Sequence, residues 1–402
     1  MNQRTRLILF FTVQGLLFMG ANFAHAVTPA FFMDLGLEDY MFGVALGSML
    51  VINFSVSPFW GKMIDYISSK TAILIGCAGY ALGQFFFMNS ANSTQIIIVR
   101  MFTGIFAAAT FVAILTYIVN TVKDEKQRAY YMTVGATLSS ICSSFGFLVG
   151  GLLGEISIRT AITAQVITIA LCGILFFIVC ENDAKVNIKE VKMSEVFKAS
   201  NPLSAFLASR KFMTITLLML FFVVISQSVG STAFDQSFNY YLRNQFDFST
   251  GYNGVIRGAM GLITLVVNST ITLWIINRTD MRKSIIFVFA AASFAMCLVI
   301  LSAHNPVPFV AANVAVFAAT AVSLPLIQNM VAKSADGENS NLVMGLFNSM
   351  RALGGIIGAF LAGFLYDVVP IYPFALGLAA FTCAGVFAWR YYDKSEKIQS
   401  MD

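Results

Sequence analysis

The chain has 402 residues, of which 58% are hydrophobic and 11% are charged, and its formal net charge is +5. A soluble protein carries about 25% charged residues, so this chain has too few charges to cover a water-soluble globule. Apolar runs of about 20 residues, the length of a membrane-spanning helix, recur along the sequence. We therefore predict a polytopic all-α membrane protein, because a β-barrel would show short alternating segments instead.

Twelve apolar runs follow one another, each long enough to cross a bilayer as a helix. They lie near 7–33, 41–60, 71–90, 95–120, 131–154, 160–180, 212–242, 253–276, 284–303, 308–332, 342–366 and 372–390. The first contains Ala24, His25 and Ala26, a pattern similar to a signal-peptide cleavage site. We interpret it as a span, because its apolar character continues to about Met33.

One long polar stretch separates the sixth run from the seventh. We therefore predict an N-terminal six-helix bundle over 1–180, a linker over 181–211, and a C-terminal six-helix bundle with a short tail over 212–402. If both termini are cytoplasmic, 20 of the 25 Lys and Arg residues fall in cytoplasmic segments and two in outer loops. By the positive-inside rule, this predicts a multi-pass protein of the inner or plasma membrane, with the linker and both termini in the cytoplasm.

The two halves of the chain resemble each other at an offset of 212 residues. Segment 132–155 falls on 344–367, with four identities and with Glu155 over Asp367. The same offset sets Asp65 over Asn277 and Lys70 over Arg282. Many secondary transporters are built from two such halves, with the substrate site between them near the midplane.

The turn after the second run, GKMIDYISSK at 61–70, places Gly61, Asp65 and Lys70 within ten positions. These residues match the motif G-x-L-a-D-r-x-G-r-k, so the chain resembles the major facilitator superfamily and, within it, the twelve-helix drug/proton antiporters. Three other motif positions differ, since Tyr66, Ser68 and Ser69 replace the family's Arg, Gly and Arg. The resemblance implies two pseudo-symmetric six-helix bundles.

Two further motifs support the resemblance. The motif l-x-x-x-R-x-x-q-G of the fourth helix is met by Ile96, Arg100 and Gly104. The exporter motif g-x-x-x-G-P-x-x-G-G of the fifth helix is matched at Gly146, Gly150 and Gly151. Phe147 stands where the motif has Pro. Glycines at this spacing let helices approach closely in a membrane, so we predict a helix-packing role for them.

The resemblance also implies a role for the 61–70 turn. A carboxylate at Asp65 can accept hydrogen bonds from the exposed N–H groups at the start of a neighbouring helix. In the family that neighbour is the eleventh helix, which here begins near Asn341. We predict that Gly61, Asp65 and Lys70 form a conformational latch that breaks during transport. The alternative is a solvated turn that carries positive-inside lysines.

Ionisable residues inside a span cost about 2.5–3.5 kcal/mol on insertion scales, which makes each a functional hypothesis. Asp235 lies deep in the seventh run, Arg100 in the fourth and His25 in the first. We predict that these three residues couple transport to protons, with His25 and Asp235 at matched depths of the repeat. The alternatives are helix packing for His25 and extension of Arg100 to the outer face.

Polar side chains near these residues are candidates for a substrate cavity. They are Asn22, Gln236, Asn239, Asn348 and Arg351. The 39 Phe and 19 Met residues can also line a permissive cavity, although most are expected to face lipid or pack between helices.

We predict a secondary transporter that exports a small amphipathic molecule or drug, with cations among the candidates, by proton-coupled alternating access. The alternative is a proton-coupled importer or facilitator of a small metabolite. The six Cys residues have no metal-ligand spacing, no phosphate-binding loop appears, and two His residues without a motif do not indicate an enzyme. We expect no cofactor, no metal and no nucleic-acid partner, the proton gradient as the energy source, and a monomer in the lipid bilayer.

Overall fold

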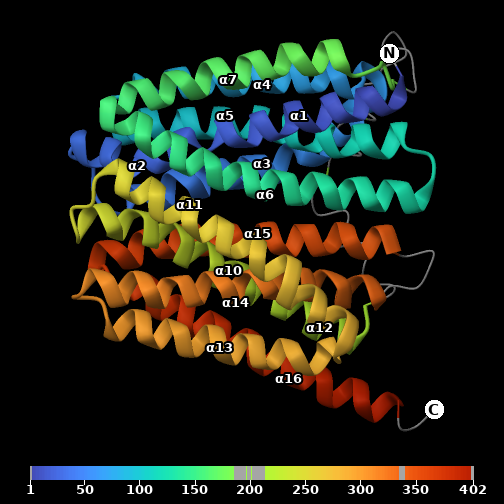
Figure 1. Ribbon diagram of the computed structural model, residues 1–402, viewed down its shortest axis with the longest axis vertical. Helices are drawn as coiled ribbons and strands as arrows, with labels where there is room; N and C mark the ends of the chain where they lie inside the picture. Colours follow the sequence, from blue (N-terminus) through green and yellow to red (C-terminus); the bar gives the residue numbers. More distant parts are fainter. Residues whose placement is uncertain (1, 185–195, 197–200, 202–212, 335–339, 400–402) are drawn as a thin grey trace. The chain divides into compact units, whose positions relative to one another are not determined.

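The computed structural model describes residues 2–184, 196, 201, 213–334 and 340–399 (Figure 1). Throughout these residues the secondary structure is helical, with no strand. Twelve of the described helices or helix pairs are long and apolar enough to cross a membrane, which confirms the predicted all-α fold with twelve spans. Most of the predicted linker 181–211 lies outside the described residues.

The first six spans are built from seven helices. These are α1 (Gln3–Ala21), α2 (Phe23–Asp34), α3 (Met41–Ile67), α4 (Ser69–Met88), α5 (Ser93–Thr121), α6 (Glu125–Ile156) and α7 (Ile158–Val179). The last six are α10 (Ile215–Asn244), α11 (Thr250–Val267) with the π-helical turn Asn268–Thr272 and α12 (Leu273–Arg278), α13 (Met281–Leu301), α14 (Pro306–Lys333), α15 (Ser340–Val368) and α16 (Tyr372–Gln399).

Two spans are interrupted in mid-course. The first breaks at Asn22, between α1 and α2, and Pro29 within α2 has no N–H to donate to the carbonyl of His25. The eighth contains the π-helical turn Asn268–Thr272. Irregular helix of this kind is frequent at functional sites and is tolerated in membranes where neighbouring groups satisfy the backbone.

The chain divides into two compact units. Unit 1 comprises 1–37, 48–202 and 247–261, and unit 2 comprises 38–47, 203–246 and 262–402. Each unit therefore includes the first turns of one helix whose remainder belongs to the other unit: α11 begins in unit 1, and α3 begins in unit 2.

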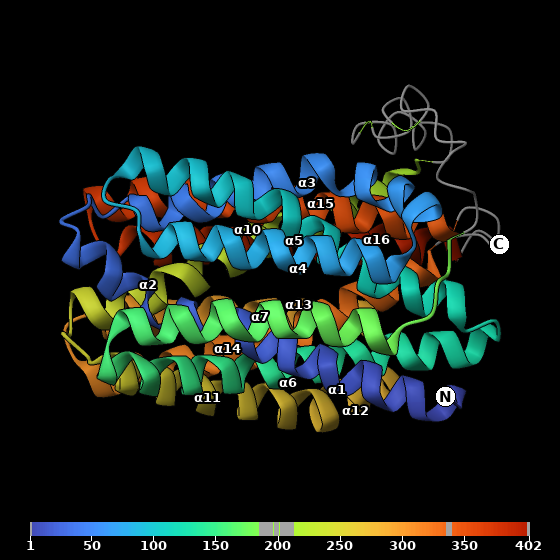
Figure 2. The same ribbon diagram turned by 90° about the horizontal axis from the view of Figure 1, so that it is seen from above.

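Unit 1 has an aromatic and aliphatic core. The helix α4 packs along α5 and α7, as both views show (Figures 1 and 2), and α1 packs on α6 and α7. At the centre, the ring of Phe10 stacks on Tyr117 at 5.0 Å and meets Phe176 edge-on at 5.4 Å. All three rings are fully buried, so α1, α5 and α7 meet at one point.

Unit 2 is organised around α10, which packs on α15 and α16, while α13 packs on α14 and α16. Its core is a cluster of rings in which Tyr241 stacks on Phe309 at 4.8 Å and Phe309 meets Phe374 at 5.5 Å.

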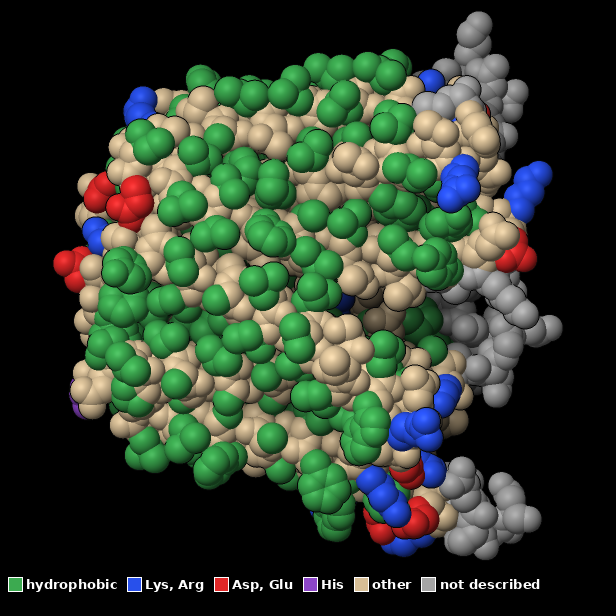
Figure 3. Space-filling view, viewed as in Figure 1, with side chains coloured by type: hydrophobic (Ala, Val, Ile, Leu, Met, Phe, Trp, Pro, Cys, Tyr) green, Lys and Arg blue, Asp and Glu red, His purple; other side chains and the backbone are tan. Residues whose placement is uncertain are grey.

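On the face drawn in Figure 3, hydrophobic side chains cover the middle of the helices and charged side chains gather toward their ends. This distribution is typical of helices that cross a bilayer.

Candidate functional site

The segment 61–70 is almost entirely helical, whereas the sequence predicted a turn. Gly61 and Asp65 lie on the last turns of α3, Lys70 lies in the first turn of α4, and Ser68 joins the two helices with a positive φ of 71°. Lys62 Nζ lies 3.1 Å from Asp65 Oδ2, and Lys70 Nζ lies 5.0 Å from the ring centre of Phe177. The side chain of Asn341 lies outside the described residues, and the latch stays a prediction.

A carboxylate that the sequence did not point to holds the start of α4. Asp183 accepts hydrogen bonds from the backbone nitrogen and the hydroxyl of Ser69, both at 2.6 Å, and from Asn120 Nδ2 at 2.8 Å. The negative charge lies at the positive end of the α4 dipole and satisfies one of its open N–H groups. Asp183 therefore ties the segment after the sixth span to the start of the third.

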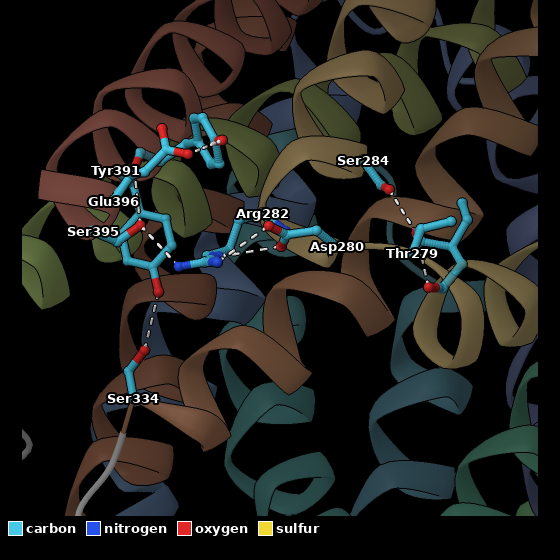
Figure 4. Close-up of polar contacts among 10 residues, drawn as sticks. Thr279, Asp280, Arg282, Ser284, Ser334, Tyr391, Ser395 and Glu396 are labelled. Carbon is cyan, nitrogen blue, oxygen red and sulfur yellow. Dashed lines mark hydrogen bonds and ion pairs between the residues drawn. The ribbon is translucent and has the colours of Figure 1, made fainter. Parts of the chain in front are cut away.

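In unit 2, the turn before α13 corresponds to the turn before α4 and is held by different residues (Figure 4). Asp280 caps α13 by accepting from the nitrogen of Arg282 at 2.9 Å, and its carboxylate pairs with that guanidinium at 3.2 Å. Arg282 Nη1 then donates to Ser395 Oγ at 3.4 Å. At an offset of 212, Ser395 corresponds to Asp183 and Arg282 to Lys70, the residue after Ser69, so the two halves make contacts at neighbouring positions of the repeat with different residues.

Asp280 lies outside the spans, and its charge is stabilised. Burial alone raises the pKa of this carboxyl, but the side-chain and backbone hydrogen bonds from Arg282, together with the charges of Arg282 and Lys283, hold the pKa below its ordinary value. Nearby, the hydroxyls of Ser334 and Tyr391 lie 3.3 Å apart and join α14 to α16 (Figure 4). These polar contacts of unit 2 thus connect α13, α14 and α16.

Arg100, on α5, is held inside unit 1. Its side chain is only 6% exposed, and its guanidinium carbon lies 3.9 Å from the ring centre of Phe87. The Nε atom has no hydrogen-bond partner among the described residues. Such a face-on contact stabilises a cation in an apolar setting without using its in-plane N–H groups.

His25 lies next to the position where the exporter motif lacks its Pro. The His25 ring is 5.9 Å from the ring of Phe147, and the guanidinium carbon of Arg257 lies 4.5 Å from the same ring. Arg257, on α11, is 7% exposed. Arg257 is not among the predicted site residues, although an ionisable side chain inside a span is the signal that could have found it.

The three motif glycines on α6 face two different helices. A Cβ at Gly150 would lie 2.5 Å from Phe23 Cα, and one at Gly146 would lie 2.8 Å from Asn22 Cβ, so both glycines pack on the first span. A Cβ at Gly151 would lie 2.8 Å from Gly254 Cα on α11. Real Cβ atoms essentially never come this close, so each of these crossings requires glycine.

The remaining predicted residues of the C-terminal half belong to unit 2. Asp235 and Asn239 lie one turn apart on α10, and Gln236 Nε2 donates to Asp235 Oδ2 at 3.4 Å. Asn348 and Arg351, three residues apart on α15, are both exposed.

His25 and Asn22 belong to unit 1, where Asn22 Nδ2 donates to the carbonyl of Phe18 at 2.8 Å. The pairing of His25 with Asp235 stays a prediction.

Comparison with known proteins shows one family. The model for the Major Facilitator Superfamily matches residues 10–310 and 274–400. Multidrug resistance protein 1 of Bacillus subtilis is 23% identical over 396 residues, covering 96% of each chain. Quinolone resistance protein NorA of Staphylococcus aureus is 24% identical over 390 residues, covering 92% of this chain and 93% of NorA. A crystal structure of the nucleoside transporter NupG aligns with a TM-score of 0.74 at 16% identity, covering 98% and 99% of the two chains.

Proposed function

Because this chain belongs to the Major Facilitator Superfamily, we propose that it is a proton-coupled exporter of small amphipathic molecules, including drugs. It is a multi-pass transporter of the cell membrane, not an enzyme. The multidrug and quinolone resistance proteins among its relatives support export as the direction and drugs as the substrate class. The proposal includes cytoplasmic termini, which rest on the distribution of Lys and Arg.

The observation that carries the proposal is the position of Asp235. It lies nine residues before the end of α10, whereas the other acidic residues of the described helices lie within five residues of a span end or outside the spans. A carboxylate this far inside a membrane is expensive to keep charged and is retained where it has a function. Asp235 is therefore the best candidate for the group that takes up and releases the transported proton.

The mechanism needs only one such carboxylate. When Asp235 is protonated, the charge is removed from the site and closure around it becomes easier. When Asp235 is deprotonated, it attracts a cationic group of the substrate, so proton and substrate compete. Binding of one then displaces the other, and alternating access of the two halves converts this competition into antiport. Arg100 and His25 are the further members of the proposed coupling set.

Efflux from cells tests the function directly. Cells that express the protein should accumulate several-fold less of a fluorescent amphipathic cation, such as ethidium, or of a quinolone than cells that lack it. An uncoupler of the proton gradient should abolish the difference. Equal accumulation in both cell types, across a panel of cationic, neutral and anionic amphipathic compounds, would refute the proposal.

A second candidate is import or facilitated passage of a small metabolite. It is favoured by Phe147, which stands where the exporter motif has Pro and instead contacts His25 and Arg257. The fold shared with a nucleoside transporter is compatible with this alternative. Faster uptake of a radiolabelled nucleoside or pentose by expressing cells, without any change in drug accumulation, would support import over export.

A further inference from the structure

Two carboxylates hold the two ends of the turn between α10 and α11. Asp39, just before α3, contacts the end of α10, and Glu155, at the end of α6, contacts the start of α11. In the proposed topology, consecutive spans cross the membrane in opposite directions, which assigns the ends of the first, fifth, seventh and eleventh spans to the face opposite the N-terminus. In the proposed orientation, both contacts therefore lie on the outer face.

The Glu155 contact lies within unit 1. Glu155 Oε1 accepts from the backbone nitrogen of Gly251 at 2.6 Å and from Thr250 Oγ1 at 3.4 Å. The hydroxyl of Ser249 accepts from the nitrogen of Tyr252 at 3.3 Å. The start of α11 thus has a cap of its own and a second acceptor from another helix, whose negative charge also suits the helix dipole.

Two glycines of α11 make room, one for the Glu155 carboxylate and the other for a close crossing of α11 with α6. A Cβ at Gly251 would lie 2.8 Å from Glu155 Oε1, so the missing side chain makes room for the carboxylate. One turn further on, Gly254 meets Gly151 backbone to backbone, with a Cβ at Gly254 only 3.0 Å from Gly151 Cα. The first turns of α11 are therefore held to α6 by one charged contact and one close helix crossing.

The Asp39 contact lies within unit 2. Asp39 Oδ1 accepts from the hydroxyl of Tyr240 at 2.7 Å and from Asn244 Nδ2 at 3.5 Å. Tyr366, on α15, donates to Asn244 Oδ1 at 3.0 Å, and Phe42 stacks on Tyr240 at 4.9 Å. Tyr240 is 1% exposed, so its hydrogen bond to a carboxylate is sheltered from water, where such bonds are strongest.

The same crossing of helices is repeated in unit 2. A Cβ at Gly363, on α15, would lie 3.0 Å from Gly43 Cα on α3. Gly363 corresponds to Gly151 at an offset of 212, and Gly43 corresponds to Gly254 at an offset of 211. In each pair, one helix comes from the first six spans and the other from the last six.

We propose that Asp39 and Glu155 form an outer latch. Each anchors a helix end from the last six spans to a residue from the first six, and both contacts must break before the outer face can open. The alternating access of the proposed function is the premise for this role. Tyr240 lies five residues after Asp235 on the same helix, so release of Asp39 frees the helix that bears the proposed coupling carboxylate.

Cysteine labelling tests the latch without a substrate. Two positions suit a reporter cysteine, because each lies about one turn deeper in the proposed membrane than a glycine crossing. They are Leu148, which approaches Gly258, and Phe360, which approaches Gly47, and they are 212 residues apart. In a background without the six native cysteines, Leu148→Cys or Phe360→Cys is labelled with a membrane-impermeant maleimide added outside. We expect Glu155→Gln and Asp39→Asn each to raise the labelling rate at least threefold, and the double variant to raise it further.

The matched control is Asp34→Asn, an exposed acid at the end of α2 on the same face, which should leave both rates unchanged. Glu155→Asp, which keeps the charge, should restore part of the protection. Gel filtration and thermal unfolding identify variants that do not fold, and only folded variants are compared. Labelling rates of folded Glu155→Gln and Asp39→Asn within 1.5-fold of the parent, or an equal rise in Asp34→Asn, would overturn the latch. Because no substrate or proton gradient is used, failure of the proposed export function would leave this result interpretable.

Discussion

Asp183 accepts two hydrogen bonds of 2.6 Å from Ser69, one from its backbone nitrogen and one from its hydroxyl, across 114 positions of sequence. The contact caps α4 with a carboxylate from the far end of the same six-helix half. Asn120 adds a third hydrogen bond at 2.8 Å. One side chain beyond the end of α7 thus joins the start of α4 to the end of α5.

Removal of this cap should destabilise unit 1. Asp183→Ala leaves the open N–H group of Ser69 without its acceptor, and loss of a helix cap costs about 1–2 kcal/mol. The neighbouring Asn182→Ala, which loses only a local bond to the nitrogen of Ala184, is the control. Thermal unfolding in detergent should show a lower midpoint for Asp183→Ala alone. Equal midpoints for the two variants would mean that the cap does not stabilise the fold.

The Asp280–Arg282 pair predicts a pH dependence. The folded-state pKa of Asp280 lies below its ordinary value of 3.8, so the folded state binds this proton less tightly than the unfolded state. The stabilisation is therefore present above the ordinary pKa and is lost as the pH falls through the lower, folded pKa. Asp280→Asn keeps a helix cap but removes the charge. The difference in unfolding midpoint between wild type and Asp280→Asn should stay constant from about pH 8 to pH 6 and shrink below about pH 4. A difference that grows with acid would contradict this sign.

The close helix crossings at the glycines predict that a larger side chain at these positions lowers the folded yield. Gly150→Leu would force atoms into the backbone of Phe23, and overpacking of this kind costs about 1–3 kcal/mol or more. Gly345 has nothing within 4 Å of an added Cβ, so Gly345→Leu is the matched control and gains helix propensity. The folded yield after gel filtration should fall for Gly150→Leu only. Similar yields for both variants would show that α6 and the first span can separate at little cost.

Phe147 predicts an aromatic requirement where the family motif has Pro. Its ring faces the guanidinium of Arg257 at 4.5 Å, and a desolvated contact of this type is worth about 1–2 kcal/mol. Phe147→Leu should lower the unfolding midpoint, whereas Phe147→Tyr should keep it. If both variants unfold like the wild type, Arg257 is stabilised by other contacts.

Hydropathy predicted the twelve spans, because a bilayer requires about 20 apolar residues whatever their tertiary contacts. The boundaries differ where helices continue into polar sequence. The structure extends α6 back to Glu125 and α16 on to Gln399, beyond the predicted 131–154 and 372–390. The break at Asn22 and the π-helical turn Asn268–Thr272 leave no hydropathy signal.

The candidate site could be predicted only where a local pattern marks it. Asp235 and Arg100 stand out as charges in apolar runs, and the glycines of α6 stand out by their spacing. Asp183 could not be found in this way, because its role comes from a contact with Ser69 that only the folded chain creates. Asp39 and Glu155 appear in the sequence as ordinary charges at span ends, and their partners are likewise distant in the sequence.

In the proposed function, Asp235 exchanges a proton for substrate. This exchange is measured as substrate-induced proton release by the purified protein, in weakly buffered detergent solution with a pH-sensitive dye. Asp393→Asn, which removes an exposed carboxylate paired with Lys397, is the control. We predict that the wild type and Asp393→Asn release protons when an amphipathic cation is added, and that Asp235→Asn releases none while still binding the compound. Undiminished proton release from Asp235→Asn would show that another group exchanges the proton.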